Sequence, residues 1–197
     1  MGYSHNFFAI DIDKLRSVYG SKDRELLAKI LENKAEEIDD NNAFFEDEIA
    51  DGEMPDTAMA LAQIFHAEVQ SNVEGAMYGY ALQMLADYMG QLVEGGEYGV
   101  AAVRDQPFDS LLLQSGPPIP IPVPSDFPEI GFLSLDQISD EIARARNYQD
   151  NLGNDSKLTP YQQRMAQSEE VIEDVHAYIE TLEMAQKLGL GIVSFRH

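Results

Sequence analysis

The apolar residues of the chain gather in two short strand-like segments near its ends and in helix-like segments between them. Residues 5–12 and 190–195 are dense in aromatic and β-branched residues, a pattern typical of strands. Residues 76–93 contain Asp87 as their one charged residue, and a helix that is apolar nearly all round belongs at the centre of a fold. We therefore expect a buried helix over 76–93 and a sheet that holds both the first and the last strand.

Five other segments show the apolar spacing or the start signals of helices. They cover residues 11–19, 21–38, 57–69, 134–148 and 159–188. Ser21 and Thr159 are placed to cap two of these helices, and Ser134 with Gln137 has the spacing of a capping box. Because residues 130–133 have the composition of a strand, the plan of a strand followed by a capped helix occurs twice in the chain.

Prolines mark the most unusual stretch of the chain, since six of the nine fall within residues 117–128. There they alternate with Ile119, Ile121 and Val123, which is a period of two. An extended chain with this period would lack N–H groups along one edge and could pair only along the other, so we predict an edge strand. The alternative is a polyproline ligand for an SH3-like groove, because the stretch also satisfies P-x-x-P. The absence of Lys and Arg from residues 105–143 disfavours it.

Two glycines interrupt the apolar segment around residue 76. Gly75 and Gly79 lie four residues apart, on one side of the expected central helix. Each costs about 1 kcal/mol of helix propensity relative to alanine. Since a missing side chain permits another element to approach closely, we predict that a neighbouring segment packs against this side.

Four stretches of the sequence carry a resemblance. They are FFAIDIDKLRSVYGS, GYALQMLADYMGQL, SGPPIPIPVPSDFPEIGFLSLDQI and LGLGIVSF. With them the chain resembles a family of small acidic bacterial proteins described only as a domain of unknown function. More distantly it resembles the YfbM-like proteins, which also begin with a strand leading into a helix and close on a strand. The resemblance implies a bacterial, cytoplasmic protein and supplies no catalytic residue, cofactor or substrate.

These patterns predict an α+β fold: a mostly helical single domain over residues 1–197, around a buried central helix. The small sheet should include the N-terminal strand, the proline-rich edge strand and the C-terminal strand. At 39–55 we expect an acidic loop or irregular segment, or else frayed helical turns, in which Phe44 and Phe45 dock onto the domain. Residues 147–158 should form an exposed loop. No uninterrupted apolar run of about 18 residues occurs, so we expect no membrane-spanning segment.

Negative charge is the most unusual bulk property, because 35 acidic residues face 13 basic ones and give a formal charge of −22. No Lys or Arg occurs in residues 35–103, and ten carboxylates fall between Glu36 and Asp56. Such a surface keeps a protein soluble and disfavours direct binding to nucleic acid or to an anionic membrane. It is compatible with a basic protein partner and with mimicry of a nucleic acid.

The candidate interaction residues within this region are Glu46, Asp47, Glu48, Asp51 and Glu53. We favour a non-enzymatic cytoplasmic interaction protein, of the immunity or inhibitor type, whose acidic face engages a basic partner. The pattern of residues leaves the oligomeric state and the identity of the partner open.

Recognised catalytic and cofactor motifs are absent from the sequence. There is no cysteine, no P-loop, no G-x-S-x-G elbow and no G-x-G-x-x-G after a strand. We therefore assign no catalytic residue, no cofactor and no metal. His176 has Glu173 and Glu180 one helical turn to either side, and a metal site there is a weaker alternative to a half-buried histidine.

One basic residue, Arg104, lies between Lys34 and Arg144. We interpret it as a structural clamp that pairs with a carboxylate. The alternative is a ligand-recognising arginine, with His66 and Tyr80 as candidate neighbours, in the pocket of an enzyme or of a small-ligand-binding protein.

Overall fold

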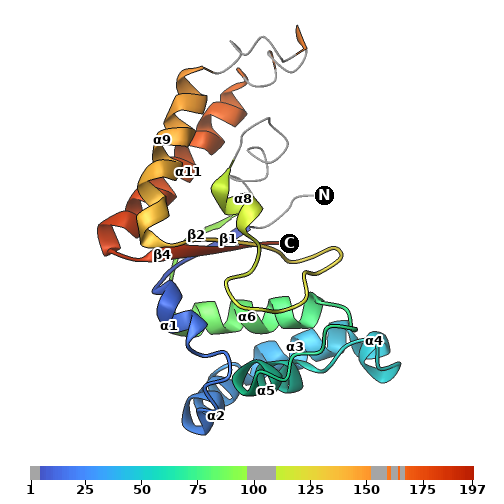
Figure 1. Ribbon diagram of the computed structural model, residues 1–197. Coiled ribbons are helices and arrows are strands. Elements are labelled where there is room, and N and C mark those ends of the chain that lie inside the picture. The colour runs from blue at the N-terminus through green and yellow to red at the C-terminus, as the bar shows by residue number, and fades with distance from the viewer. Residues whose placement is uncertain (1–4, 97–109, 152–158, 161–163, 165–166) are drawn as a thin grey trace.

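A four-stranded antiparallel sheet separates two groups of helices (Figure 1). The computed structural model describes residues 5–96, 110–151, 159–160, 164 and 167–197. The strands are β1 His5–Ile10, β2 Gln91–Gly96, β3 Glu129–Leu133 and β4 Gly191–Arg196, in the spatial order β2-β1-β4-β3. The first and last strands are therefore neighbours, which confirms that they share a sheet, and the α+β fold is confirmed with them.

Helices cover both faces of this sheet. On one face lie α1 Ile12–Arg16, α2 Arg24–Asn33, α3 Ala35–Phe44, α4 Glu46–Ala50, α5 Thr57–His66 and α6 Ala76–Met89; on the other lie α8 Leu111–Ser115, α9 Leu135–Asp150 and α11 Glu169–Leu188.

Successive side chains of β1 enter two separate cores. Phe8 and Ile10 pack into the core that contains α6, whereas Phe7 and Ala9 pack into the core formed with α9 and α11. A strand that is buried on both faces is apolar at nearly every position, because neither face meets water. This is why residues 5–12 show a dense apolar run instead of an alternation.

The central helix is α6, and the prediction that it is buried is confirmed. Tyr78 and Leu82 on it are fully buried. The helix is shorter than the expected 76–93, because it ends before Gly90 and the chain continues as the strand β2. A Cβ atom on Gly90 would lie 2.8 Å from the carbonyl oxygens of both Ala86 and Ala9. The missing side chain thus lets the chain turn out of α6 and pair directly with β1.

The proline-rich stretch is not an edge strand, and that prediction was wrong. Residues 116–128, which we call the proline strap, contain no strand and instead run along α6. Ile119 and Ile121 are buried in the core that contains α6, and the Ile121 N–H donates to the Ile119 carbonyl oxygen at 2.9 Å, a local turn. A ladder along the isoleucine edge would still be possible, but the sheet is built without this stretch, in the order β2-β1-β4-β3. Burial of the isoleucine side chains in the core stabilises the strap in place of that ladder.

The side of α6 that carries two glycines is the side on which the proline strap lies. A Cβ atom on Gly75 would lie 2.6 Å from the Pro122 carbonyl oxygen, and one on Gly79 would lie 2.7 Å from Cγ of Pro128. The Glu74 carboxylate then accepts hydrogen bonds from the backbone N–H and the hydroxyl of Ser125, both at 2.9 Å. The prediction that another segment packs closely on these glycines is therefore confirmed.

Helix starts were predicted with mixed success. The capping box of Ser134 is present at the start of α9. By contrast, the single helix expected over 159–188 is interrupted: Pro160 and Arg164 are helical, but α11 itself begins after Ser168. The helix α2 is capped by the Asp23 side chain and not by Ser21. Two residues able to cap lie close together before α2, and the carboxylate also interacts favourably with the positive end of the helix dipole.

Residues 39–55 are more regular than an irregular loop and closer to the helical alternative. The helix α3 continues to Phe44, and the short α4 follows after Phe45. The expected loop at 147–158 begins later, because α9 extends to Asp150, and residues 152–158 lie outside the described part of the chain. Within the described residues, no helix combines the length and the apolar character needed to cross a membrane.

Candidate functional site

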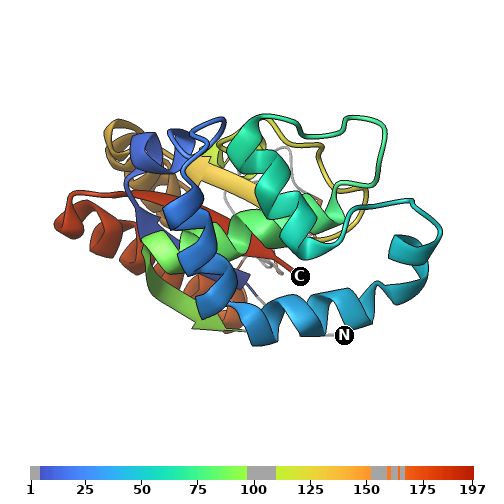
Figure 2. The same ribbon diagram turned by 90° about the horizontal axis from the view of Figure 1, so that it is seen from below.

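Residues 35–56 form an acidic arm, made of α3, α4 and the turn that follows, on one side of the molecule (Figure 2). The arm is attached to the body through its base. Ile38 is buried, and Oδ1 of Asn42 accepts hydrogen bonds from the backbone N–H and the hydroxyl of Thr57, at 2.9 and 2.8 Å. Met54 is buried where the chain returns to the body, but α4 at the tip has no buried residue. The contact of α4 with the body is made by Ile49, which is half-buried against the core that contains α6.

The acidic arm is helical in α3 and α4 although its sequence is strongly acidic. Glu46, Asp47 and Glu48 occupy the first turn of α4, as Glu36 and Glu37 do in α3. Carboxylates in a first turn interact favourably with the free N–H groups and the positive end of the helix dipole. The order of charges along the chain thus offsets part of their mutual repulsion.

All five predicted interaction residues lie on the tip of the acidic arm. Glu46, Asp47 and Glu48 belong to α4, and Asp51 and Glu53 belong to the turn after it. Four of the side chains are exposed and Glu48 is half-buried. None of the five forms an ion pair with a residue that the structure describes. The tip therefore presents uncompensated negative charge to the solvent.

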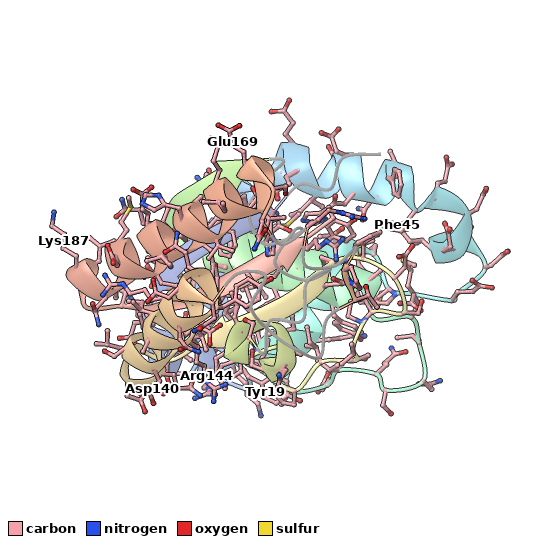
Figure 3. All side chains as sticks on the ribbon, turned by 90° about the horizontal axis from the view of Figure 1, so that it is seen from above. Tyr19, Phe45, Asp140, Arg144, Glu169 and Lys187 are labelled. Atoms are coloured by element: carbon pink, nitrogen blue, oxygen red, sulfur yellow. The ribbon has the colours of Figure 1, made fainter. Side chains whose placement is uncertain are left out.

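A row of aromatic rings connects the arm to the body. Phe44 and Phe45 meet edge to face with centroids 4.8 Å apart, Phe45 lies 5.6 Å from Tyr80, and Tyr80 stacks on His197 at 5.4 Å. Phe45 is half-buried, whereas Phe44 is 77% exposed. Figure 3 labels Phe45 on the side of the acidic arm. The structure thus brings the candidate residue Tyr80 together with the arm.

Burial favours the neutral forms of both titratable side chains in this row. It raises the pKa of Tyr80, with a smaller contribution from the negative charge of Asp126. It lowers the pKa of His197, whose Nε2 lies 2.7 Å from Oε1 of Gln83. A neutral aromatic row does not offset the negative field of the acidic arm.

Of the other two candidate residues, His66 is described by the structure and Arg104 is not. His66 is the last residue of α5, and its Nδ1 lies 2.7 Å from the Ala62 carbonyl oxygen on the same helix. Arg104 lies outside the described residues, so both the clamp and the ligand interpretation stay predictions.

Sequence reasoning was wrong about one member of the site and missed another. It expected both Phe44 and Phe45 to dock onto the domain, and for Phe44 this was wrong. With 3.6 residues per turn, adjacent residues at a helix end point in different directions, so two neighbouring phenylalanines rarely share one contact surface. His197 was missed because only the fold places the last strand beside α6 and Tyr80.

A separate cluster of hydrogen-bonded polar side chains is buried around Glu141. Glu141 is fully buried, and its carboxylate accepts hydrogen bonds from the Ser110 hydroxyl at 2.6 Å, the Tyr178 hydroxyl at 2.7 Å and the Leu111 N–H at 3.0 Å. Burial raises the pKa of Tyr178 well above its usual value. Because three donors satisfy the carboxylate and water does not reach it, we interpret the cluster as the anchor of α8 on α9 and α11.

The described residues contain no group of three His, Asp or Glu side chains arranged to hold an ion. Nδ1 of His176 lies 3.6 Å from Oε1 of Glu180, and both side chains are exposed.

One comparison with known proteins gave a match. A family model described as a domain of unknown function, DUF7691, matches residues 1–197, so the chain belongs to that family. Neither the curated proteins nor the solved structures gave a significant match.

Proposed function

Starting from membership of the DUF7691 family, we propose that this chain is a non-enzymatic interaction protein whose acidic arm engages a basic protein partner. The observation that carries the proposal is the tip of the arm, where five carboxylates project without ion pairs among the described residues. A surface of one sign attracts a partner of the other sign and increases the rate of encounter.

Phe44 supports a protein partner over a simple cation. Its side chain is 77% exposed beside the carboxylates, although burying the apolar surface of a phenylalanine is strongly favourable in free energy. A neighbouring aromatic face can bind the guanidinium group of an arginine while the carboxylates accept its hydrogen bonds. Arginine-rich segments are therefore the partner surface that fits the arm best.

A nucleic-acid mimic would use the same carboxylates and would compete with DNA for a DNA-binding partner. Competition binding with duplex DNA distinguishes the two cases once a partner is in hand. The relationship to YfbM-like proteins, the bacterial origin and the cytoplasmic location stay predictions from the sequence.

The test is affinity capture from the source cells with three forms of the full chain. The arm variant carries Glu46→Gln, Asp47→Asn, Glu48→Gln, Asp51→Asn and Glu53→Gln. The control variant carries the same number of neutralised, exposed carboxylates away from the tip: Glu32→Gln, Glu68→Gln, Asp140→Asn, Asp150→Asn and Glu173→Gln. Asp140, for example, lies on α9 (Figure 3).

We expect a basic protein that the wild type and the control variant recover and the arm variant does not. Its association rate, measured with purified proteins, should fall steeply as salt is added. Equal recovery by the arm variant and the control variant, or binding that salt does not weaken, would contradict the proposal.

A further inference from the structure

A ridge of four exposed side chains runs along α11. Ile172, His176, Glu180 and Met184 follow one another at intervals of four residues, so they form one i, i+4 ridge on the helix surface. The opposite face of α11 packs against α9 and the sheet, and Figure 3 shows the helix at the outside of the molecule. Ile172 is 40% exposed and Met184 is 45% exposed. Two apolar side chains therefore stay in water at the ends of a ridge whose middle is polar.

This ridge is complementary to itself when it is turned end to end. Ile172 and Met184 lie six residues to either side of Tyr178, and His176 and Glu180 lie two residues to either side of it. A second copy of α11 that runs antiparallel, with the two Tyr178 positions level, brings Ile172 beside Met184 of the second copy. It also brings His176 beside Glu180 of the second copy. By symmetry each of these contacts occurs twice.

Ridges with this spacing pack in the commonest geometry of crossed helices. When the i, i+4 ridges of two helices interdigitate, the helix axes cross at about −50° and lie roughly 8–10 Å apart. This angle aligns the two ridges, so contact is confined to the turns between positions 172 and 184. Because α11 spans about 30 Å, its two ends diverge from the second copy. Such a contact is at the small end of specific interfaces, and the dimer should be weak.

The polar centre of the ridge selects the antiparallel orientation. Nδ1 of His176 lies 3.6 Å from Oε1 of Glu180 on its own helix. In the antiparallel pair the two imidazoles and the two carboxylates alternate, and an imidazole has an N–H to donate to a carboxylate whether it is neutral or protonated. A parallel pair would instead place the two Glu180 carboxylates side by side. The order of groups along the ridge thus fits a second copy of this chain.

Repulsion between two acidic copies is limited at this surface. Glu173 and Glu183 flank the ridge on opposite sides, so an antiparallel crossing keeps them apart, and Glu183 is paired with Arg146 of α9. The acidic arm belongs to helices on the other face of the sheet (Figure 1). At physiological ionic strength the charges of exposed groups are screened beyond about 8 Å. The arms of the two copies therefore oppose this contact little.

We propose that the chain forms an antiparallel homodimer through Ile172, His176, Glu180 and Met184 of α11. A two-fold axis at the level of Tyr178 relates the copies, so the interface uses the same patch on both and closes at two subunits. The interface buries the four exposed apolar side chains of the two ridges. The ridge shares no residue with the acidic arm, so the dimer does not depend on the proposed function.

The first test uses the absence of cysteine from the chain. Ile172→Cys and Met184→Cys are prepared as two separate full-length variants, mixed, and treated with a mild oxidant. Disulfides should form between the two variants, which mass spectrometry distinguishes. Each variant alone should stay reduced, because positions 172 and 184 are about 18 Å apart along a helix and a disulfide needs Cα atoms within about 7 Å.

Leu135→Cys mixed with Met184→Cys measures the rate of random encounter, since Leu135 is an exposed residue on α9. Disulfides that form faster within one variant than between the two would mean a parallel or unrelated contact and would overturn the proposal. A mixture of Ile172→Cys and Met184→Cys that reacts no faster than this control would do the same.

The second test measures the dimer Kd by sedimentation equilibrium. Glu180→Lys and His176→Glu should each raise the Kd about tenfold, because each loses both symmetric polar contacts and places like charges or two cationic groups together. The double variant exchanges the two roles and should return to within about threefold of the wild type. Met184→Gln should also weaken the dimer. Leu135→Gln, at a residue of nearly equal exposure, and the arm variant should leave it unchanged.

A wild type that stays monomeric up to about 1 mM would overturn the assignment. So would a double variant that is as weak as the two single variants, or equal weakening by Met184→Gln and Leu135→Gln. All substituted positions are exposed, so the variants should fold, and circular dichroism checks this.

Discussion

The proline strap and the acidic arm both lie next to α6 but are held in opposite ways. The strap is tied along its length: Ile119 and Ile121 are buried, and Ser125 is bonded to Glu74. The arm is attached at its base, through Ile38 and Asn42, and its tip has no buried side chain. Packing therefore decides the conformation of the strap, and local helix formation with solvated charge decides that of the arm. Substitutions beneath or in the strap should change the stability of the fold, whereas substitutions in the arm should change its association with a partner.

The largest effect on stability should come from adding a methyl group beneath the strap. Gly75→Ala would bring Cβ to 2.6 Å from the Pro122 carbonyl oxygen and to 2.8 Å from the Pro124 nitrogen. Both are backbone atoms of the strap, so the clash is relieved only if the strap moves. We expect the free energy of unfolding to fall by about 2 kcal/mol, within the usual range for overpacking. Chemical denaturation measures it.

Gly79→Ala provides the matched comparison on the same helix. Its Cβ would meet the ring of Pro128 at 2.7 Å, so it should also destabilise, and adding Pro128→Ala should restore part of the loss. A gain of about 1 kcal/mol from Gly79→Ala, as helix propensity alone predicts for a position inside α6, would show that the strap is as loosely held as the arm.

A smaller effect should come from the tie between Glu74 and Ser125. The hydrogen bonds from Ser125 lower the pKa of Glu74 below 4.5. A lowered folded pKa contributes stability above the unfolded value, and that stability is lost as the pH falls through the folded pKa. We expect Glu74→Gln to lower the free energy of unfolding by about 1 kcal/mol at neutral pH.

The difference between Glu74→Gln and the wild type should shrink to nothing at acidic pH, as urea denaturation across a pH series would show. Glu68→Gln, an exposed substitution after α5, is the control and should leave the pH dependence unchanged. A constant difference at every pH would mean that the charge of Glu74 does not hold the strap.

The smallest effect on stability is expected for the arm variant with five neutralised carboxylates. Its side chains are solvated and lack ion pairs among the described residues, so the free energy of unfolding should change by less than about 0.5 kcal/mol. Reduced repulsion should make any change at low salt a gain. Thermal and chemical unfolding of this variant and of the control variant measure it, and a loss as large as that of Gly75→Ala would place the arm in the packed body.

Local sequence patterns correctly predicted the parts of the fold that depend on neighbouring residues. The burial of α6, the capping box at Ser134 and the end of α11 before Gly189 all follow from local patterns. The strap shows where this reasoning stops. An alternation of Pro and Ile describes an extended chain, but whether that chain meets a strand or a helix depends on elements far away in sequence.

The same division holds for the candidate sites. The density of carboxylates over residues 36–56 is visible in the sequence, and so is the absence of nearby Lys and Arg. The row of aromatic rings from Phe44 to His197 cannot be seen in the sequence, because it joins residues that lie far apart along the chain.

The sequence by itself determined an α+β chain with a buried helix, a sheet that holds both ends, and an acidic surface segment, since periodicity, composition and charge are properties of neighbouring residues. Only the tertiary structure decided that β2 forms after Gly90, that the proline strap packs on Gly75 and Gly79, and that Phe44 stays exposed. The physical reason is that each of these features depends on close packing between distant segments, where differences of an ångström decide which arrangement fits.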